Sequence, residues 1–463
     1  MKPLKLEEIV RAIDGRIVRQ GKAEKITGIS TDTRTIKAGD LFIPLIGENF
    51  NGHKFIEDAV SKGAAAILTQ ELNIGLPVGT HIVYTNDTLN ALQTLSSWYL
   101  KIFNPDIIAV TGSTGKTTCK DMIYQVLSQK FRALKTQGNF NNEIGLPLTL
   151  FNLDSSHEIA VLEMGMSDLG EISRLVELAP PKVGLITNIG LSHIERLGSR
   201  DNILKAKLEL FENFDDSCTA VINNDDDLLR QAAKDFTFPH VSFGIKNQAD
   251  YMAEDIELDG ERGLSYNLKV KGQRQRIRLN APGLHNVYNS LAAIAVARAF
   301  DLELDHIQRG LLDYKTDPMR MNIITIGDDI KIINDSYNAS PDSVESALRV
   351  LASMEGQRRI AVLGDMLELG DFSQEAHRQV GASLAEKQID ILITRGEYGK
   401  WTIEGAINQG MSPTKLMQFN SNNDIIAWLK EILTEGDRIL VKGSRGMQME
   451  EIVMSLQDGR TDL

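Results

Sequence analysis

One segment constrains the fold of this 463-residue chain most strongly. In this segment a buried strand runs into a glycine-containing turn, and Lys-Thr then opens a helix. The segment Ile107–Thr118 reads Ile-Ile-Ala-Val-Thr-Gly-Ser-Thr-Gly-Lys-Thr-Thr. Such a turn directs backbone N–H groups and a helix N-terminus at phosphate oxygens, with Lys116 reaching the terminal phosphates and Thr117 placed to bind Mg²⁺. The rest of the predicted phosphate-binding turn is Gly112, Ser113, Thr114, Gly115 and Thr118. The segment therefore predicts nucleotide binding.

The residues after this turn alternate between apolar strands and helical patterns. Strands are expected at 159–164, 183–188 and 219–223, and helices at 118–128, 171–178 and 203–213. Continuously apolar strands separated by helices predict parallel pairing, with both faces of the sheet covered. Residues 251–278 instead alternate polar and apolar side chains around Lys271-Gly272, which indicates an antiparallel hairpin, and a helix over 287–299 closes this block.

These patterns divide the chain into three blocks. Residues 1–103 mix short strands and helices and end at Asn104-Pro105, which disfavours continued helix. Residues 104–313 contain the phosphate-binding turn, and residues 314–463 repeat strand–helix units. We therefore expect an α/β protein with three domains: a small mixed α/β N-terminal domain, a central P-loop-type domain with a mostly parallel sheet and helices on both faces, and a C-terminal Rossmann-like doubly wound domain.

Composition argues against several classes of function. The formal charge of −13 argues against a general nucleic-acid binder, which needs a positive surface. The basic run at 269–278 alternates and has no interleaved aromatic residues, so it predicts a solvated hairpin face. Only Cys119 and Cys218 are present, which disfavours a disulfide scaffold or zinc module, and Cys119 is predicted to be a small packed residue. With no signal-peptide core and no apolar span, a cytoplasmic protein is expected.

The short spacing between Gly112 and Gly115, followed by Lys-Thr-Thr, resembles the Mur ligases of peptidoglycan synthesis and their folylpolyglutamate synthetase relatives. Glu163 and His193 follow successive predicted strands, and the resemblance implies that they contact metal ions at the phosphates. Lys207 matches the lysine that is carbamylated in this family and then holds a second Mg²⁺. Without the resemblance, Glu163 would be interpreted as a surface carboxylate, His193 as a packed histidine and Lys207 as part of a solvated helix face.

The resemblance extends to the segments that would contact the nucleotide. Gly283–Asn289 is similar to the family's G-x-H-N-x-x-N, which implies that His285 and Asn289 lie near adenine, although Asn286 could also cap the next helix. Arg320 matches an arginine that reaches the phosphates, and Asp335 a residue that meets the ribose. The implied catalytic residues are Lys116, His193, Lys207 and Arg320, and the implied cofactors are ATP and two Mg²⁺ ions. Because these residues come from two blocks, we expect the site to assemble when the domains close.

Within the family, the sequence is most similar to the ligase that adds D-alanyl-D-alanine to UDP-N-acetylmuramoyl-tripeptide. The similarity lies in residues 136–147, 334–341, 363–370 and 442–446, and in N-terminal segments that resemble a UDP-sugar-peptide-binding domain. The implied substrate contacts are Asp32, Thr33, Arg34, Gly47, Gly52, His53, Asn139, Asn141, Asn142, Tyr337, Asn338, Lys442 and Ser444.

The expected protein is a monomer that binds two small-molecule substrates, UDP-MurNAc-tripeptide and D-Ala-D-Ala, and no nucleic acid. One alternative is an amino-acid-adding ligase of the same family. The ligase that acts one step earlier commonly carries a D-N-P-R motif in its last domain, and that motif is absent from this sequence. The other is a P-loop ATPase or nucleotide-dependent binding module, which would need neither co-substrate.

Overall fold

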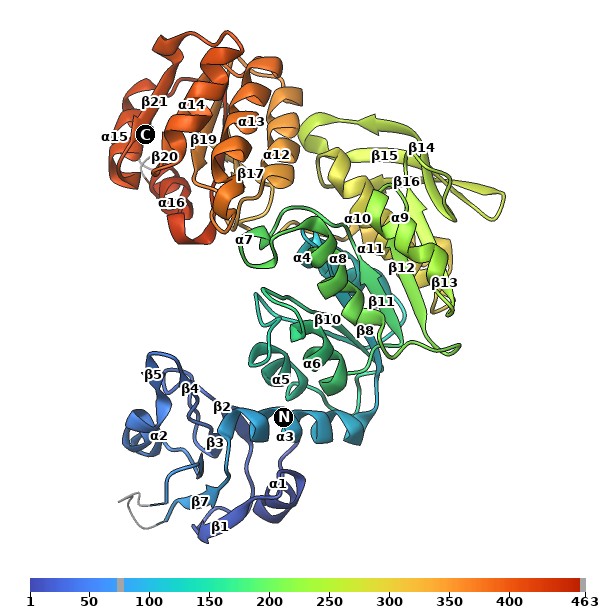
Figure 1. The fold of residues 1–463 in the computed structure, drawn as a ribbon, viewed down its shortest axis with the longest axis vertical. Helices are drawn as coiled ribbons and strands as arrows, with labels where there is room; N and C mark the ends of the chain where they lie inside the picture. Colours follow the sequence, from blue (N-terminus) through green and yellow to red (C-terminus); the bar gives the residue numbers. More distant parts are fainter. Residues whose placement is uncertain (73–78, 459–463) are drawn as a thin grey trace.

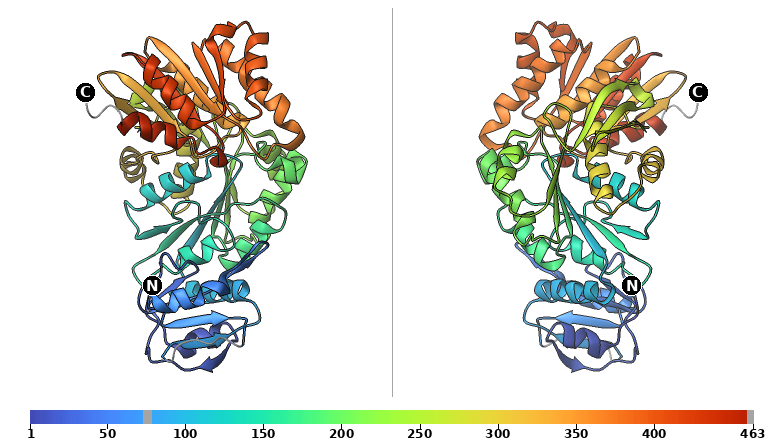
Figure 2. Two further views of the ribbon diagram at one scale, coloured as in Figure 1. Left: turned by 90° about the vertical axis from the view of Figure 1, so that its left-hand side faces the viewer. Right: turned by 90° about the vertical axis from the view of Figure 1, so that its right-hand side faces the viewer.

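The computed structural model describes residues 1–72 and 79–458 and contains three main β-sheets that follow one another along the chain. The N-terminal and C-terminal sheets lie at opposite ends of an elongated molecule, with the central sheet between them (Figures 1 and 2). No helix in the described ranges is long and apolar enough to cross a membrane. We propose that each sheet with its covering helices is one domain, with boundaries at 103/104 and 313/314.

The N-terminal sheet has five strands in the order β1-β7-β6-β3-β2, and only β1 is antiparallel to its neighbour. The elements of this block are α1 (Leu6–Ala12), β1 (Arg16–Arg19), β2 (Gly28–Ser30), β3 (Asp40–Phe42), β4 (Ile46–Gly47), β5 (Phe50–Asn51), η1 (Gly52–Phe55), α2 (Ile56–Ser61), β6 (Ala66–Thr69), β7 (His81–Tyr84) and α3 (Thr88–Phe103). Strands β4 and β5 pair with each other in a separate two-stranded sheet. Helix α3 ends at Asn104, which adopts φ 48° directly before Pro105, as the Asn-Pro pair predicted.

The central sheet has nine strands in the order β16-β15-β14-β13-β12-β11-β8-β10-β9. The elements of its first part are β8 (Asp106–Thr111), α4 (Lys116–Leu127), β9 (Ala133–Lys135), α5 (Gly145–Leu150), β10 (Ile159–Glu163), α6 (Glu171–Leu178), β11 (Val183–Ile186), α7 (Ile194–Leu197), α8 (Arg200–Leu208) and η2 (Glu209–Phe211). In the parallel register Val110 lies opposite Glu163, and Thr111 lies opposite Ile186. The carboxyl ends of β8, β10 and β11 therefore meet at one edge of the sheet.

Successive residues of β8 pack on opposite faces of the central sheet. Ile108 and Val110 share a core with Val126 of α4 and with Ile294 of α10. Ala109 belongs to the other core, with Leu175 of α6. The remaining central elements are β12 (Thr219–Asn223), α9 (Asp227–Ala232), η3 (Ala233–Asp235), β13 (His240–Gly244), β14 (Tyr251–Leu258), η4 (Gly260–Arg262), β15 (Leu264–Val270), β16 (Gln273–Leu279), α10 (Leu284–Arg298) and α11 (Leu304–Leu312). Burial on both faces accounts for the continuous apolar runs of these strands.

The predicted hairpin is part of a three-stranded antiparallel unit, because β14 also pairs with β15. Lys271 and Gly272 have φ values of 46° and 77°, the left-handed conformation that a two-residue hairpin turn requires. Lys269 and Arg274 both pair with Glu254 of β14. The basic run is thus the partly neutralised polar face of a strand pair, in agreement with the interpretation from sequence.

The C-terminal sheet has six strands in the order β17-β18-β22-β19-β20-β21, all parallel except β17. Its elements are β17 (Asn322–Ile326), β18 (Ile330–Asp335), α12 (Pro341–Ser353), β19 (Arg358–Gly364), η5 (Gly370–Phe372), α13 (Ser373–Glu386), β20 (Ile391–Arg395), α14 (Gly399–Asn408), η6 (Pro413–Lys415), β21 (Leu416–Phe419), α15 (Asn422–Ile432), β22 (Asp437–Lys442), η7 (Arg445–Met447) and α16 (Glu450–Asp458). The Ser340-Pro341 pair predicts a helix start, because Ser caps well and Pro suits the first helical position, and α12 begins at Pro341 behind the N-cap Ser340.

Most boundaries fall within a few residues of those expected, and two differences have a local cause. The apolar run at 41–45 predicts a strand, and the observed strand stops at Phe42, two residues before Pro44, which cannot donate to a sheet. Residues 54–61 predict a short helix, which starts as the 3₁₀ turn η1, where Asn51 accepts a hydrogen bond from the His53 N–H.

Candidate active site

The turn between β8 and α4 can be built only with glycine at two positions. Gly112 has φ 146°, and a Cβ there would lie 1.8 Å from Thr187 Oγ1. Gly115 is the N-cap of α4 at φ 80°, and its Cβ would lie 2.8 Å from Asn289 Oδ1. The two glycines that define the sequence motif are therefore required by close contacts as well as by backbone conformation.

Hydrogen bonds from the loop after β11 hold this turn in place. Asn188 Oδ1 accepts from the Thr114 N–H at 3.0 Å, and Asn188 Nδ2 donates to the Thr114 carbonyl at 3.1 Å. Thr187 Oγ1 donates to the same carbonyl at 2.6 Å, and Ser113 Oγ accepts from the Gly190 N–H at 2.8 Å. The phosphate-binding turn is thus rigidly attached to the neighbouring strand of the sheet.

Lys116 is half-buried and lies over the turn. Its Nζ donates to the Gly112 carbonyl at 2.7 Å. Burial lowers the pKa of Lys116, and the positive charge of Arg320 lowers it further, while Glu163 acts in the opposite direction. Arg320 therefore brings a second cation from the C-terminal block close to the phosphate-binding turn.

Glu163 ends β10 beside this turn and is 3 % exposed. Its Oε1 accepts from Asn141 Nδ2 at 2.9 Å. Its Oε2 is buried and receives no hydrogen bond from any described residue, and the nearest cation is Lys120, whose Nζ lies 3.9 Å away. A buried carboxylate oxygen without a donor is costly for the fold and is suited to a cation.

Lys207 lies on α8 with 1 % of its surface exposed. Within residues 1–72 and 79–458, its Nζ forms no ion pair, and the charge that acts on it is the like charge of Lys116. Burial holds the pKa of Lys207 well below its usual value, and Lys116 lowers it further. Lysine is almost never fully buried without a partner, and a neutral amine is the form that reacts with CO₂.

His193 is the N-cap of α7 and has φ 64°, which is unusual for a residue other than glycine. Its Nδ1 lies 2.8 Å from Glu368 Oε2 of the C-terminal block. This hydrogen bond lowers the pKa of Glu368. A residue of the C-terminal block thus positions His193, the second residue that is predicted to contact metal.

The acidic and imidazole groups fit Mg²⁺ bound together with a nucleotide rather than a cage made by protein alone. No group of three His, Cys, Asp or Glu side chains gathers as a metal site in residues 1–72 and 79–458. Mg²⁺ is commonly held by one or two carboxylates, waters and substrate phosphates, which matches the single unpartnered Glu163 oxygen beside a phosphate-binding turn.

The predicted adenine-side residues lie at the start of α10. Burial lowers the pKa of His285 to about 4, and Asp335 and Lys442 also act on it, which places it at the junction with the C-terminal sheet. Asn289 Nδ2 donates to Asn286 Oδ1 at 3.0 Å, and Asn289 Oδ1 accepts from the Cys119 thiol at 3.3 Å. Burial raises the pKa of Cys119, so this thiol is a packed hydrogen-bond donor, as expected.

The C-terminal residues of the site gather at the carboxyl ends of β18 and β22. The Arg320 guanidinium lies 3.9 Å from the centre of the Tyr337 ring. Lys442 Nζ donates to Asp335 Oδ2 at 2.5 Å and to the Asn338 carbonyl at 2.9 Å. Ser444 Oγ accepts from the Leu367 N–H at 2.9 Å. The predicted Tyr337, Asn338, Lys442 and Ser444 are therefore brought together with Asp335.

The predicted N-terminal substrate residues lie in the loop after β2, in β4 and in η1, in the block at the far end of the molecule from the C-terminal block (Figure 1). Arg34 is exposed and forms a bidentate pair with Asp32, and Thr33, after Lys62, helps to lower the pKa of Asp58. His53 is buried, with its Nδ1 2.9 Å from Asn51 Oδ1, and Gly52 packs against Leu45. A Cβ at Gly47 would meet no residue of the described chain within 4 Å beyond its two neighbours, so its surroundings impose no structural requirement for glycine.

The three asparagines predicted after β9 have different surroundings. Asn141 donates to Glu163, Asn142 Oδ1 accepts from the Gly145 N–H at the start of α5, and Asn139 is exposed. Of these three asparagines, the structure thus brings only Asn141 directly to the Glu163 carboxylate, and Asn142 caps the start of α5.

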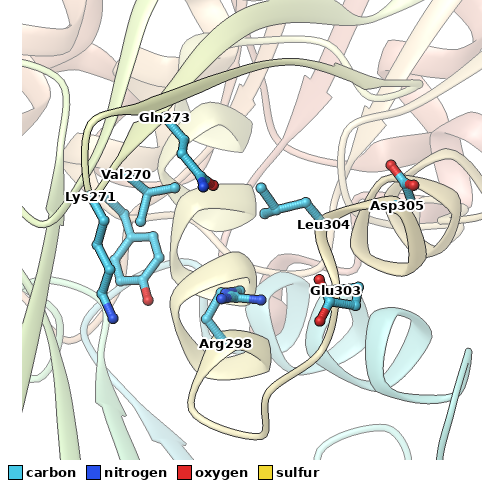
Figure 3. A pocket seen from close by; sticks show the side chains of 8 residues that line it. Val270, Lys271, Gln273, Arg298, Glu303, Leu304 and Asp305 are labelled. Carbon is cyan, nitrogen blue, oxygen red and sulfur yellow. The ribbon is translucent and has the colours of Figure 1, made fainter.

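Two surface grooves of about 320 and 510 Å³ lie elsewhere, around the β15–β16 turn and the end of α10. Figure 3 shows the smaller groove, with Arg298 between Lys271 and Glu303. None of the predicted site residues lines either groove. The phosphate-binding turn, and not these grooves, therefore defines the candidate site.

Three residues that the motifs did not single out belong to the site. Asn188 holds the turn, Lys120 lies beside Glu163, and Glu368 binds His193. Asn188 had a usable signal, because polar residues directly after a strand of a parallel sheet lie at the ligand edge. The roles of Lys120 and Glu368 depend on contacts between elements that periodicity does not reveal.

Comparison with known proteins agrees with this geometry. The Mur ligase middle domain matches residues 110–297, the glutamate ligase domain 319–445 and the Mur ligase catalytic domain 25–94. The UDP-N-acetylmuramoyl-tripeptide–D-alanyl-D-alanine ligase of Bacillus subtilis (strain 168) is 39% identical over 97% of this chain and 98% of its own.

Solved structures are similar over nearly the whole length. A MurF crystal structure from Acinetobacter baumannii has a TM-score of 0.90 at 31% identity and covers 99% of both chains. MurF from Thermotoga maritima, solved in complex with ADP, has a TM-score of 0.82 at 28% identity and covers 94% of this chain and 98% of that one. These similarities, together with its motifs, show that the chain belongs to the Mur ligase family.

Proposed function

We propose that this chain joins D-alanyl-D-alanine to the terminal carboxylate of UDP-N-acetylmuramoyl-tripeptide at the expense of ATP, giving the pentapeptide, ADP and phosphate for peptidoglycan synthesis. The observation that carries the proposal is the meeting of three charged side chains: Lys116 at the turn after β8, Glu163 at the end of β10, and Arg320 from the next domain. Within the described residues, Glu163 Oε2 receives no hydrogen bond. The relatives named for this reaction support the choice of substrates.

The reaction requires alignment and charge neutralisation more than a protein nucleophile. An oxygen of the tripeptide carboxylate attacks the γ-phosphorus of ATP, the bond to the β–γ bridging oxygen breaks, and ADP leaves. Lys116 and Arg320 carry the positive charge that stabilises the transferring phosphoryl group. The free amine of the dipeptide then attacks the acyl phosphate, and phosphate leaves as the amide forms and the amine loses a proton.

The residues that would hold Mg²⁺ are Thr117, Glu163, His193 and Lys207 in a carbamylated form. Mg²⁺ neutralises phosphate charge when it is bound. Two observations support this assignment: Glu163 Oε2 is buried without a hydrogen-bond donor in the described residues, and burial lowers the pKa of Lys207, which favours its neutral amine. We propose two Mg²⁺ ions, one at Glu163 and one at carbamylated Lys207.

We assign the remaining parts of the substrates to the outer domains. The N-terminal sheet, with Asp32, Arg34 and His53, would bind the UDP-sugar end. The C-terminal residues Tyr337, Asn338, Lys442 and Ser444 would contact the nucleotide or the dipeptide from the carboxyl edge of β18 and β22. We propose that the enzyme acts as a monomer in the cytoplasm, where UDP-linked precursors and ATP are available.

Phosphate release in the presence of each substrate combination tests the proposal. We expect release from ATP only when UDP-MurNAc-tripeptide and D-Ala-D-Ala are both present, and no release with single amino acids. Lys116→Ala should abolish release, whereas Lys130→Ala, at an exposed lysine just beyond α4, should leave it unchanged. ATP turnover that ignores both co-substrates would favour the ATPase alternative, and turnover with a single amino acid would favour an amino-acid-adding ligase.

A further inference from the structure

The loop between β19 and η5 is fixed at several successive residues. Asp365 accepts hydrogen bonds from the Tyr398 N–H, at 3.2 Å to each carboxylate oxygen. The Met366 N–H donates to His377 Nε2 at 3.1 Å, and the Leu367 N–H donates to Ser444 Oγ at 2.9 Å. These contacts come from different segments, so the position of the next residue, Glu368, is determined by the fold of the whole C-terminal domain.

Glu368 projects from this loop to the central domain. It adopts φ 63°, and its carbonyl accepts from the Glu195 N–H at 3.3 Å. Its carboxylate lies 2.8 Å from His193 Nδ1, and the Glu368 side chain is 63% exposed. Two non-glycine residues in the left-handed region, His193 and Glu368, thus meet across the domain interface. Backbones held in this region generally need a surrounding structure that compensates for the strain.

An ordinary interface ion pair does not account for this arrangement well. Exposed ion pairs contribute little to stability and do not require two residues with positive φ. A histidine that binds a metal through one ring nitrogen, by contrast, usually donates its other N–H to a carboxylate, which fixes the tautomer and the ring plane. His193 has such a carboxylate on Nδ1, which leaves Nε2 as an acceptor.

We propose that Glu368 is the positioning residue for a metal-binding His193, and that docking of the C-terminal domain thereby completes the Mg²⁺ site on the central domain. This inference rests on the proposed function only in assigning His193 to the metal. Glu368 itself is placed outside the metal contacts, and its effect is transmitted through the imidazole.

The test uses Mn²⁺ as the probe, with electron paramagnetic resonance of the full-length protein saturated with ADP. We expect Glu368→Ala to raise the Mn²⁺ dissociation constant about ten-fold, in line with the loss of an outer carboxylate. Glu368→Gln keeps an acceptor for the Nδ1–H and should have a smaller effect. The matched control is Asp371→Ala, at an exposed acid three residues along the same loop, which should bind Mn²⁺ as the wild type does.

A double-mutant cycle separates positioning from a general effect on structure. His193→Ala and His193→Ala/Glu368→Ala should bind Mn²⁺ equally weakly, because Glu368 acts only through the imidazole. Pulsed measurements should detect ¹⁴N coupling to Mn²⁺ in the wild type and lose it in His193→Ala. Wild-type affinity in Glu368→Ala, additive effects in the cycle, or no ¹⁴N coupling in the wild type would each overturn the inference.

These readouts need neither tripeptide nor dipeptide. A failure of the substrate test above would therefore remove the proposed function and leave the Mn²⁺ result standing. A wild type that joins the two substrates, combined with unchanged Mn²⁺ binding in Glu368→Ala, would remove only this inference.

Discussion

At the residue scale, one buried lysine destabilises the fold and is also a proposed metal-binding residue. Lys207 is almost completely buried and lacks a carboxylate partner in the described part of the chain, so its ammonium form is disfavoured. The folded-state pKa is lower than the unfolded one, so between these two values the unfolded chain binds more protons. Stability therefore rises with pH across that window, and at neutral pH the uncarbamylated lysine destabilises the fold.

Replacing Lys207 should separate stability from activity. In bicarbonate-free buffer, Lys207→Met should melt at a higher temperature than the wild type at pH 7, with a smaller gain at pH 9. Its kcat should fall on the order of 100-fold, as expected when an anionic metal contact is lost. Calorimetry and phosphate release measure the two effects. Lys205→Met, at an exposed lysine on the same helix, is the control, and a Lys207→Met protein with normal kcat would refute the assignment.

At the element scale, two helices begin with nearly identical glycine caps but only one cap faces the candidate site. Gly115 and Gly170 both have φ 80°, with ψ of −5° and −6°. A Cβ at Gly115 would lie 2.8 Å from Asn289 Oδ1, whereas at Gly170 the nearest atom is a flexible arginine nitrogen at 3.7 Å. The backbone cost of a side chain is therefore shared, and the steric cost is specific to Gly115.

Gly115→Ala and Gly170→Ala should both lose about 1 kcal/mol of stability from the left-handed backbone. Only Gly115→Ala should in addition raise the KM for ATP, because it displaces Asn289 at the predicted nucleotide site. Denaturant unfolding and steady-state kinetics on both variants check this expectation. Equal KM values for ATP in the two variants would contradict the placement of the nucleotide.

The loop that carries Glu368 should respond to acid through His377, which is 2% exposed. Burial lowers the pKa of His377, and its Nε2 accepts the Met366 N–H, so protonation would break that bond. Because the folded-state pKa is below the unfolded value of about 6.5, this contribution to stability is complete above pH 6.5 and is lost as pH falls below it.

We expect the free energy of unfolding to fall less steeply from pH 6.5 to pH 5 in His377→Gln than in the wild type. The two slopes should differ by up to about 1.4 kcal/mol per pH unit. His240→Gln, at an exposed histidine, should keep the wild-type slope. Urea titrations across this range provide the measurement. Parallel slopes in all three proteins would show that His377 does not titrate with unfolding.

Local signals predicted much of the fold because each had a local physical cause. The Ser340-Pro341 helix start, the Asn104-Pro105 break and the Lys271-Gly272 turn depend on a few neighbouring residues. The four-residue helix α7 is too short to show a helical pattern of its own, and its existence depends on packing. Likewise, the motif is sufficient to predict Lys116 as a site residue. The contact between Glu368 and His193 joins residues that are far apart in the sequence, so no local pattern predicts it.

At the scale of the whole molecule, an acidic protein of charge −13 must bind anionic substrates through local features. The features that we propose for this are Lys116, Arg320 and the N-terminus of α4, which come from two domains. The C-terminal domain contacts the central one through His193–Glu368 and through the Lys331–Glu261 pair. The first of these contacts lies at the proposed active site, which is the arrangement expected if closure controls catalysis.

Closure should be visible in solution scattering. We expect the radius of gyration to decrease when an ATP analogue and UDP-MurNAc-tripeptide are added together, because both ligands bridge domains. Arg320→Ala should weaken this response, since it removes a C-terminal contact to the nucleotide. Scattering profiles that stay identical with and without ligands would contradict ligand-driven closure.

The most direct test of the proposed chemistry follows oxygen from the carboxylate. UDP-MurNAc-tripeptide labelled with ¹⁸O in its terminal carboxylate is incubated with ATP and D-Ala-D-Ala, and the released phosphate is analysed by mass spectrometry. Activation as an acyl phosphate predicts one ¹⁸O in each phosphate for every amide formed. Unlabelled phosphate from the labelled substrate would mean that water attacks ATP, and would contradict the account of this chain as a carboxylate–amine ligase.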